Sequence, residues 1–180
     1  MTLAKLGPGL KRLPEMRSLR WLCLLVSLAA LAAPLAHVLE LPNKLRLDGP
    51  LWLAVQQHLY NGWGPIIGAP TEIGGLLLSL AALTAGRRER RALAAYGVAA
   101  VAFLGMLFCF FVFNDPVNKA LAPWTPATLP ADWMSYRWRW ELGHALAALC
   151  ALIAVVASGV GLMGAKKGVI PDGPKGRSGT

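Results

Sequence analysis

The sequence predicts an all-α membrane protein, a four-helix transmembrane bundle whose outer Trp- and Pro-rich loops form a lid. Hydrophobic residues make up 56% of the 180 residues and charged residues only 15%, and the mean hydropathy is +0.49. Few soluble domains have that balance. Four apolar segments each approach the ~20 residues that a helix needs to cross a bilayer. They cover residues 21–39, 66–85, 92–113 and 140–163.

Each apolar segment ends where charge, Gly or Pro interrupts it. The interruptions begin at Glu40, Gly86, Asn114 and Gly164. The first segment also has the basic lead and the Ala-rich run of a secretory signal peptide. Its apolar run is longer than is usual in signal peptides and carries a His–Glu pair at its end, so we expect it to remain as a transmembrane helix.

The sequence divides into three parts. Residues 1–19 form a basic cytoplasmic lead, and residues 20–163 form the four-span membrane domain. Residues 164–180 are rich in Gly, Pro and Lys, a composition that predicts a disordered cytoplasmic tail.

The distribution of basic residues predicts the orientation in the membrane. Thirteen of the 18 Lys and Arg residues lie before the first segment, between the second and third, or after the fourth. Because cytoplasmic loops carry an excess of Lys and Arg, we expect a multi-pass protein of the inner (cytoplasmic) membrane with both termini cytoplasmic. The net charge of +9 therefore reflects topology and contact with membrane lipid. No recognition fold accompanies the basic stretches, so no nucleic-acid partner is predicted.

The two outer loops are predicted to cover the bundle. Residues 41–65 contain a short helical pattern at 51–60, whereas four prolines make residues 114–139 mostly non-helical. Six of the seven tryptophans lie on this outer side. An interfacial aromatic belt accounts for part of them. Trp124 and Trp133 lie far from either span, which favours a lid with aromatic walls over a cavity.

Ionisable residues occur inside three of the four spans, where they are costly and usually functional. Glu141 and His144 are three residues apart, so they share one face of the last helix. His37 and Glu72 lie at a similar depth near the outer ends of their own segments. We therefore predict that these four side chains converge on one site in the outer half of the membrane.

Two chemistries fit those residues. Two imidazoles and two carboxylates on facing helices are ligands for a metal such as iron or copper, which predicts His37, Glu72, Glu141 and His144 as a metal site. Alternatively the site holds no metal, and Glu72 or Glu141 works as an acid or base beside His144. A purely structural interpretation pairs Glu141 with Arg137 or Arg139 in an interhelical clamp.

The chain also resembles the small four-span membrane family that includes the fungal anthrone oxygenases. The resemblance covers about residues 20–163 and rests on the stretches 37–45, 53–60, 113–118, 124–133 and 137–144, the last of which reads Arg-Trp-Arg-Trp-Glu-Leu-Gly-His. It implies a monooxygenase that inserts oxygen from O₂ into an activated aromatic CH₂. It also implies that Glu141 with His144 supplies the base, and that Asn114 and Asn118 hold substrate oxygens.

The predicted function is accordingly an oxygen-dependent oxidoreductase or oxygenase that acts on a hydrophobic, ring-containing small molecule. The catalytic residues are predicted to be Glu72, Glu141 and His144. The predicted substrate-binding residues are Asn114, Asn118, Trp124, Trp133, His58 and Tyr60. Two alternatives stay open: a small non-catalytic subunit of a larger membrane complex or homo-oligomer, and a membrane protein that binds a metal or small ligand.

Overall fold

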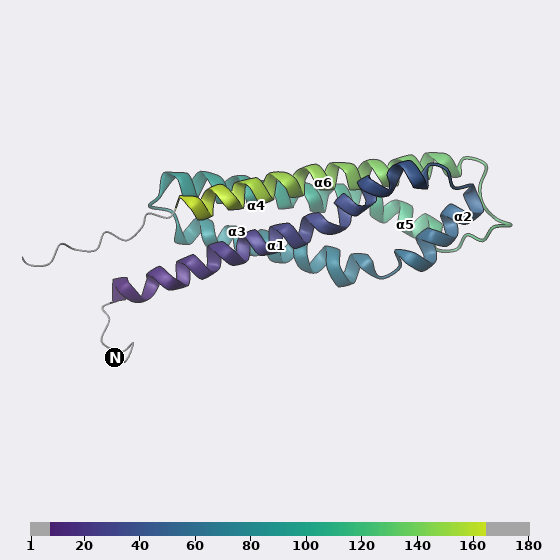
Figure 1. Cartoon of the computed structure of the whole chain (residues 1–180). Helices are drawn as coiled ribbons and strands as arrows, with labels where there is room; N and C mark the ends of the chain where they lie inside the picture. The colour runs from purple at the N-terminus through teal and green to yellow at the C-terminus, as the bar shows by residue number, and fades with distance from the viewer. Residues whose placement is uncertain (1–7, 165–180) are drawn as a thin grey trace, which may run out of the picture.

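A computed structural model of the chain describes residues 8–164, with side chains described from Met16 onward. Every regular element in that part of the chain is a helix, and four long helices form the bundle (Figure 1). They are α1 (Pro8–Lys44), α3 (Ala69–Ala85), α4 (Arg90–Cys109) and α6 (Trp133–Met163). The predicted fold class, an all-α four-helix bundle, is confirmed.

Short helical elements extend the bundle at the end opposite the chain termini (Figure 1). Two are the α-helices α2 (Gly49–Ala54) and α5 (Asp115–Leu121). Three are π-helical turns: η2 (Val55–Leu59), η3 (Gly64–Gly68) and η4 (Phe110–Asn114). The helical pattern predicted at 51–60 therefore corresponds to α2 and η2.

Four helices are long and apolar enough to span a membrane, which makes this an integral membrane protein. Their bounds differ from the predicted ones: the candidate spans run over Met16–Lys44, Gly64–Ala85, Arg90–Leu121 and Trp133–Met163. The predicted lead 1–19 overlaps α1, which already begins at Pro8. Residues 165–180 of the predicted tail lie outside the described part of the chain.

The prediction that residues 114–139 are mostly non-helical is wrong at both ends. The third span continues through η4 into α5, and α6 starts at Trp133. Pro116 does not stop the third span because it occupies the first turn of α5, where a helix needs no N–H donor. The irregular segment is therefore limited to residues 122–132.

The half of the bundle nearer the termini is packed tightly by small residues. Ala30, Ala102, Ala151 and Ala154 are buried around the ring of Phe103. Gly75 is required there, because a Cβ atom at that position would overlap the same ring. Small residues allow helices to approach closely where no water drives them together. Large apolar side chains such as Leu77 and Val101 face outward, as expected for contact with lipid.

Candidate functional site

A cavity of about 650 Å³ lies in the half of the bundle that the short elements extend. All four spans contribute to its walls, with His37 from α1, Glu72 from α3 and His144 from α6. Phe110 and Asn114 of η4 close another side. A volume of this size is typical of small-molecule sites, which range over roughly 300–1,000 Å³.

All three π-helical turns of the described chain border this cavity. Gln56 and Gln57 come from η2, Gly68 from η3, and Asn114 from η4. A π-turn inserts one residue into a helix and changes which side chains share a face, and such turns are frequent at functional sites. The effect is visible in η4, where Asn114 is only 3% exposed whereas Phe111 is 62% exposed.

Four aromatic or imidazole rings gather around His37. The ring centroid of His37 lies 4.5 Å from that of Tyr60, 4.8 Å from that of Trp140 and 4.3 Å from that of His144. Trp63 is slightly farther, at 6.0 Å. These rings form an aromatic wall of the cavity.

The amide of Asn114 positions His144. Its Nδ2 atom donates to the carbonyl oxygen of Trp140 at 2.9 Å and lies 2.6 Å from Nδ1 of His144. Gly143 makes this approach possible, because a Cβ atom at that position would overlap the Asn114 amide. The glycine between Glu141 and His144 is therefore part of the site.

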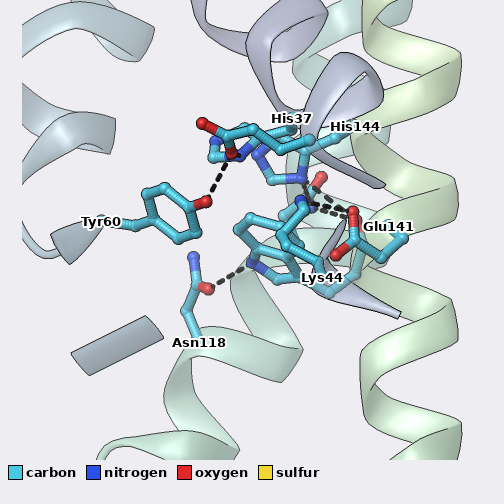
Figure 2. A network of polar contacts seen from close by, with 9 residues as sticks. His37, Lys44, Tyr60, Asn118, Glu141 and His144 are labelled. Carbon is cyan, nitrogen blue, oxygen red and sulfur yellow. Dashed lines mark hydrogen bonds and ion pairs between the residues drawn. The ribbon is translucent and has the colours of Figure 1, made fainter. Parts of the chain in front are cut away.

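Glu141 is paired with a residue that the sequence analysis did not single out. Lys44 Nζ lies 2.8 Å from Glu141 Oε2, and each residue is only 4% exposed (Figure 2). The ammonium also lies 5.0 Å from the centroid of the Trp140 ring, within the range of a cation–π interaction. The helical spacing of His37, Glu40 and Lys44 could have revealed this contact, but the first span was predicted to end before Glu40.

The two arginines predicted to pair with Glu141 bind backbone carbonyls instead. Arg137 Nη1 donates to the carbonyl oxygen of Leu47 at 3.1 Å, and Arg139 Nη2 donates to that of Val112 at 2.6 Å. The interhelical clamp exists, but with Lys44 in place of either arginine.

Glu40, the partner of His37 in the His–Glu pair that ends the first apolar segment, also joins the site. Tyr60 donates its hydroxyl hydrogen to Glu40 Oε2, and His37 Nδ1 lies 3.7 Å from the same oxygen (Figure 2). Burial raises the pKa of Tyr60 above its usual value, and the hydrogen bond to Glu40 raises this pKa further. Tyr60 is therefore held as a neutral phenol that donates to the carboxylate.

The cavity brings together most, but not all, of the predicted site residues. Those that line it are His37, Tyr60, Glu72, Asn114, Asn118, Trp124 and His144. Three predicted residues do not. His58 is exposed, because the phase of η2 directs Gln56 and Gln57 inward. Trp133 packs against Trp52, with ring centroids 5.6 Å apart, and does not line the cavity. Glu141 is paired with Lys44.

The predicted metal site is not formed. Across the described residues, no group of three or more His, Cys, Asp or Glu side chains is arranged to hold a metal ion. Of the predicted ligands, His37, Glu72 and His144 line the cavity, whereas Glu141 does not and its Oε2 atom is paired with Lys44.

The fold and the cavity define an integral membrane protein with a small-molecule-sized pocket enclosed by its four spans. Comparisons with protein-family models, curated proteins and solved structures found no match. The resemblance to the anthrone oxygenase-like family therefore stays a prediction.

Proposed function

We propose that this protein takes a hydrophobic, ring-containing compound from the membrane into the cavity and oxidises it with molecular oxygen. The cavity of about 650 Å³ among four apolar spans is the observation that carries the proposal. In the orientation given by the basic residues, both termini are cytoplasmic and the cavity lies in the outer half of the inner membrane.

The walls of the cavity favour flat, ring-containing ligands. Tyr60, Trp63, Phe110, Trp124 and Trp140 all line it. Aromatic side chains offer large apolar surfaces, and pairs of rings gain about 0.5–1.5 kcal/mol beyond the burial of area. Polar side chains also line the cavity, among them Gln56, Asn61, Asn118 and His144, so a flat ligand that carries a polar group fits best.

Glu72 is the side chain best placed to act as a base. It lies in α3, within the second membrane span, and it lines the cavity. It has no hydrogen-bond or ion-pair partner among the described residues. A carboxylate inside a span is costly and usually functional. By contrast, Glu141 is held by Lys44, so the base role passes to Glu72.

The reaction class comes from the resemblance of residues 20–163 to anthrone oxygenases. An activated ring CH₂ loses a proton to Glu72, and the resulting carbanion gives its electron pair to O₂ and forms a C–O bond. Glu72 returns its proton to the terminal peroxide oxygen, and the resulting hydroperoxide loses water as the second C–H proton leaves and the O–O bond breaks. The sum is CH₂ + O₂ → C=O + H₂O, so the four electrons lost by carbon reduce O₂ without another reductant.

Oxygen uptake by the purified protein in detergent tests this function, with anthrone as the probe. We expect uptake to exceed the protein-free rate, and Glu72→Gln to remove the excess, because the amide keeps the shape of the side chain but accepts no proton. His58→Ala is the matched control and should keep the wild-type rate, because His58 is exposed and outside the cavity.

Oxygen uptake equal to the protein-free rate with anthrone would overturn the oxygenase function. Anthrone binding without uptake would then leave a ligand-binding protein. Absence of binding would favour the subunit of a larger membrane complex.

A further inference from the structure

The contacts of Asn114 determine how its side-chain amide is oriented. Its Nδ2 atom lies 2.9 Å from the carbonyl oxygen of Trp140, and this distance requires a donor. Rotating the amide by half a turn would place Oδ1 against that carbonyl, and two acceptors would then face each other. The NH₂ group therefore lies toward Trp140 and, at 2.6 Å, toward Nδ1 of His144.

This orientation fixes the position of the proton on His144. A carbonyl oxygen has two lone pairs. The oxygen of Trp140 already accepts from Asn114 and, as in any α-helix, from the backbone N–H four residues later, which is that of His144. Nδ1 of His144 faces a donor NH₂ group, so it must accept a hydrogen bond. The imidazole is then neutral, and its single N–H is on Nε2.

The Nε2–H group of His144 is unpaired in the described part of the chain, because the Nε2 atom has no hydrogen-bond partner there. It is also not one of the fully buried polar atoms without a hydrogen-bond partner. His144 lines the cavity, so this donor is available to a ligand.

Asn118 supplies a second donor beside the same tryptophan. Its Oδ1 atom accepts a hydrogen bond from Trp140 Nε1 at 3.0 Å, which leaves its NH₂ group without a partner in the described part of the chain (Figure 2). Asn118 also lines the cavity. Trp140 thus contacts both donor residues, one by ring packing and one by a hydrogen bond.

We propose that Asn114 holds His144 as a hydrogen-bond donor, and that His144 and Asn118 together select ligands with an oxygen atom attached to the ring, a carbonyl or a phenol. Asn114 is a positioning residue, and the two donors are binding residues. The inference deepens the proposed function by naming the substrate class, and it rests on the cavity but not on the oxidation step. It also replaces the predicted role of His144 as a base.

Nitrogen-15 NMR of the protein labelled only on histidine tests the positioning step without any ligand. The chain has three histidines, and His37→Gln and His58→Gln identify the remaining signals. We expect Nδ1 of His144 to resonate as an unprotonated nitrogen and Nε2 as a protonated one. A proton on Nδ1, alone or on both nitrogens, would overturn the proposal.

Two variants separate the effect of Asn114 from a general disturbance. In Asn114→Ala the competing donor is gone, so Nδ1 can carry the proton and donate to the Trp140 oxygen 3.1 Å away. We expect the proton to move to Nδ1. Asn118→Ala is the matched control, since Asn118 makes no hydrogen bond to His144, and it should leave the proton on Nε2. If the imidazole proton of His144 has the same position in the wild type, Asn114→Ala and Asn118→Ala, the role of Asn114 is refuted.

Fluorenone and fluorene test the selection step, because they differ only in that a ring carbonyl replaces a ring CH₂. Binding is measured without oxygen, so that the CH₂ of fluorene cannot be oxidised. Quenching of tryptophan fluorescence reports binding, since Trp63, Trp124 and Trp140 line the cavity. We expect fluorenone to bind about 3- to 10-fold more tightly, the range of one or two neutral hydrogen bonds. His144→Phe should remove most of that preference, and His144→Gln, which keeps a donor at similar reach, should retain it.

Equal affinity of the wild type for the two compounds would overturn the selection step. A preference for fluorenone in a protein that consumes no oxygen would keep the donor pair and reject only the oxidation.

Discussion

At the scale of single residues, the ion pair between Lys44 and Glu141 is the most consequential contact of the site. Both charges are withdrawn from water, and Glu141 Oε1 has no hydrogen-bond partner. The attraction between two buried charges barely offsets the cost of their desolvation, so such a pair adds little net stability. Removing one partner is different, because the other charge then stays buried and uncompensated.

We therefore predict that Lys44→Met destabilises the protein by about 3–5 kcal/mol, the usual cost of breaking a buried ion pair. The quantity measured is the free energy of unfolding in detergent micelles, and the loss of the helical circular dichroism signal reports unfolding. The double variant with Glu141→Leu should recover most of the loss, because an apolar pair of similar volume leaves no buried charge.

Lys119→Met is the matched control for that prediction. Lys119 Nζ lies 2.6 Å from Asp115 Oδ2, but the lysine side chain is 76% exposed. Exposed ion pairs contribute little to stability. A loss for Lys119→Met as large as that for Lys44→Met would show that burial does not govern the effect.

At the scale of secondary-structure elements, one turn of α6 holds several parts of the site. Trp140 forms part of the aromatic wall, Glu141 binds Lys44 of α1, and His144 faces the cavity. Gly143 lies on the side where η4 approaches, which lets the Asn114 amide reach the α6 backbone. This turn therefore connects α6 to α1 on one side and to η4 on the other.

We predict that Gly143→Ala destabilises the protein by about 1–3 kcal/mol, the usual cost of overpacking a well-packed contact. The added methyl group would overlap the Asn114 amide and the Phe113 side chain. Gly159→Ala in the same helix is the control, because nothing lies within 4 Å of a Cβ atom there. Since Ala favours helix over Gly, Gly159→Ala should be neutral or slightly stabilising in the same unfolding measurement. Equal losses of stability in Gly143→Ala and Gly159→Ala would contradict the close contact between Gly143 and Asn114.

At the scale of the whole molecule, the two ends of the bundle are built differently. At the end nearer the termini, Arg20 pairs with Glu89 at 3.0 Å and Ser27 contacts Ser158 at 3.0 Å. Small residues such as Ala30, Ala151 and Ala154 fill the space between these contacts and the cavity. At the other end, the π-turns and short helices spread the chain around the cavity. The cavity therefore lies toward one side of the membrane.

The predicted orientation places α5, the last part of the third span, at the outer surface of the membrane and the turn between α3 and α4 in the cytoplasm. We expect a membrane-impermeant thiol reagent to label Lys119→Cys in intact cells and Arg88→Cys only after permeabilisation. Both positions are exposed, and the native cysteines are replaced by alanine in the background protein. Labelling of Arg88→Cys alone in intact cells would invert the topology and place the cavity in the inner half.

The number of spans and the all-helical fold class could be predicted from hydropathy alone, because hydropathy is summed over consecutive residues of the sequence. Depth within a span is also a property of sequence position, so the sequence indicated that His37, Glu72 and His144 would lie at one level, and all three line the same cavity. Neither argument depends on how the helices are rotated about their axes.

Rotation and register were decided only by the tertiary structure. One residue corresponds to about 100° around a helix, so each π-turn redirects the side chains that follow it. For that reason the sequence did not show that Asn114 faces inward, that His58 faces outward, or that Trp133 packs away from the cavity. The partner of Glu141 depended on α1 continuing past Pro42 to Lys44, because one more helical turn brings that ammonium within 2.8 Å of the carboxylate.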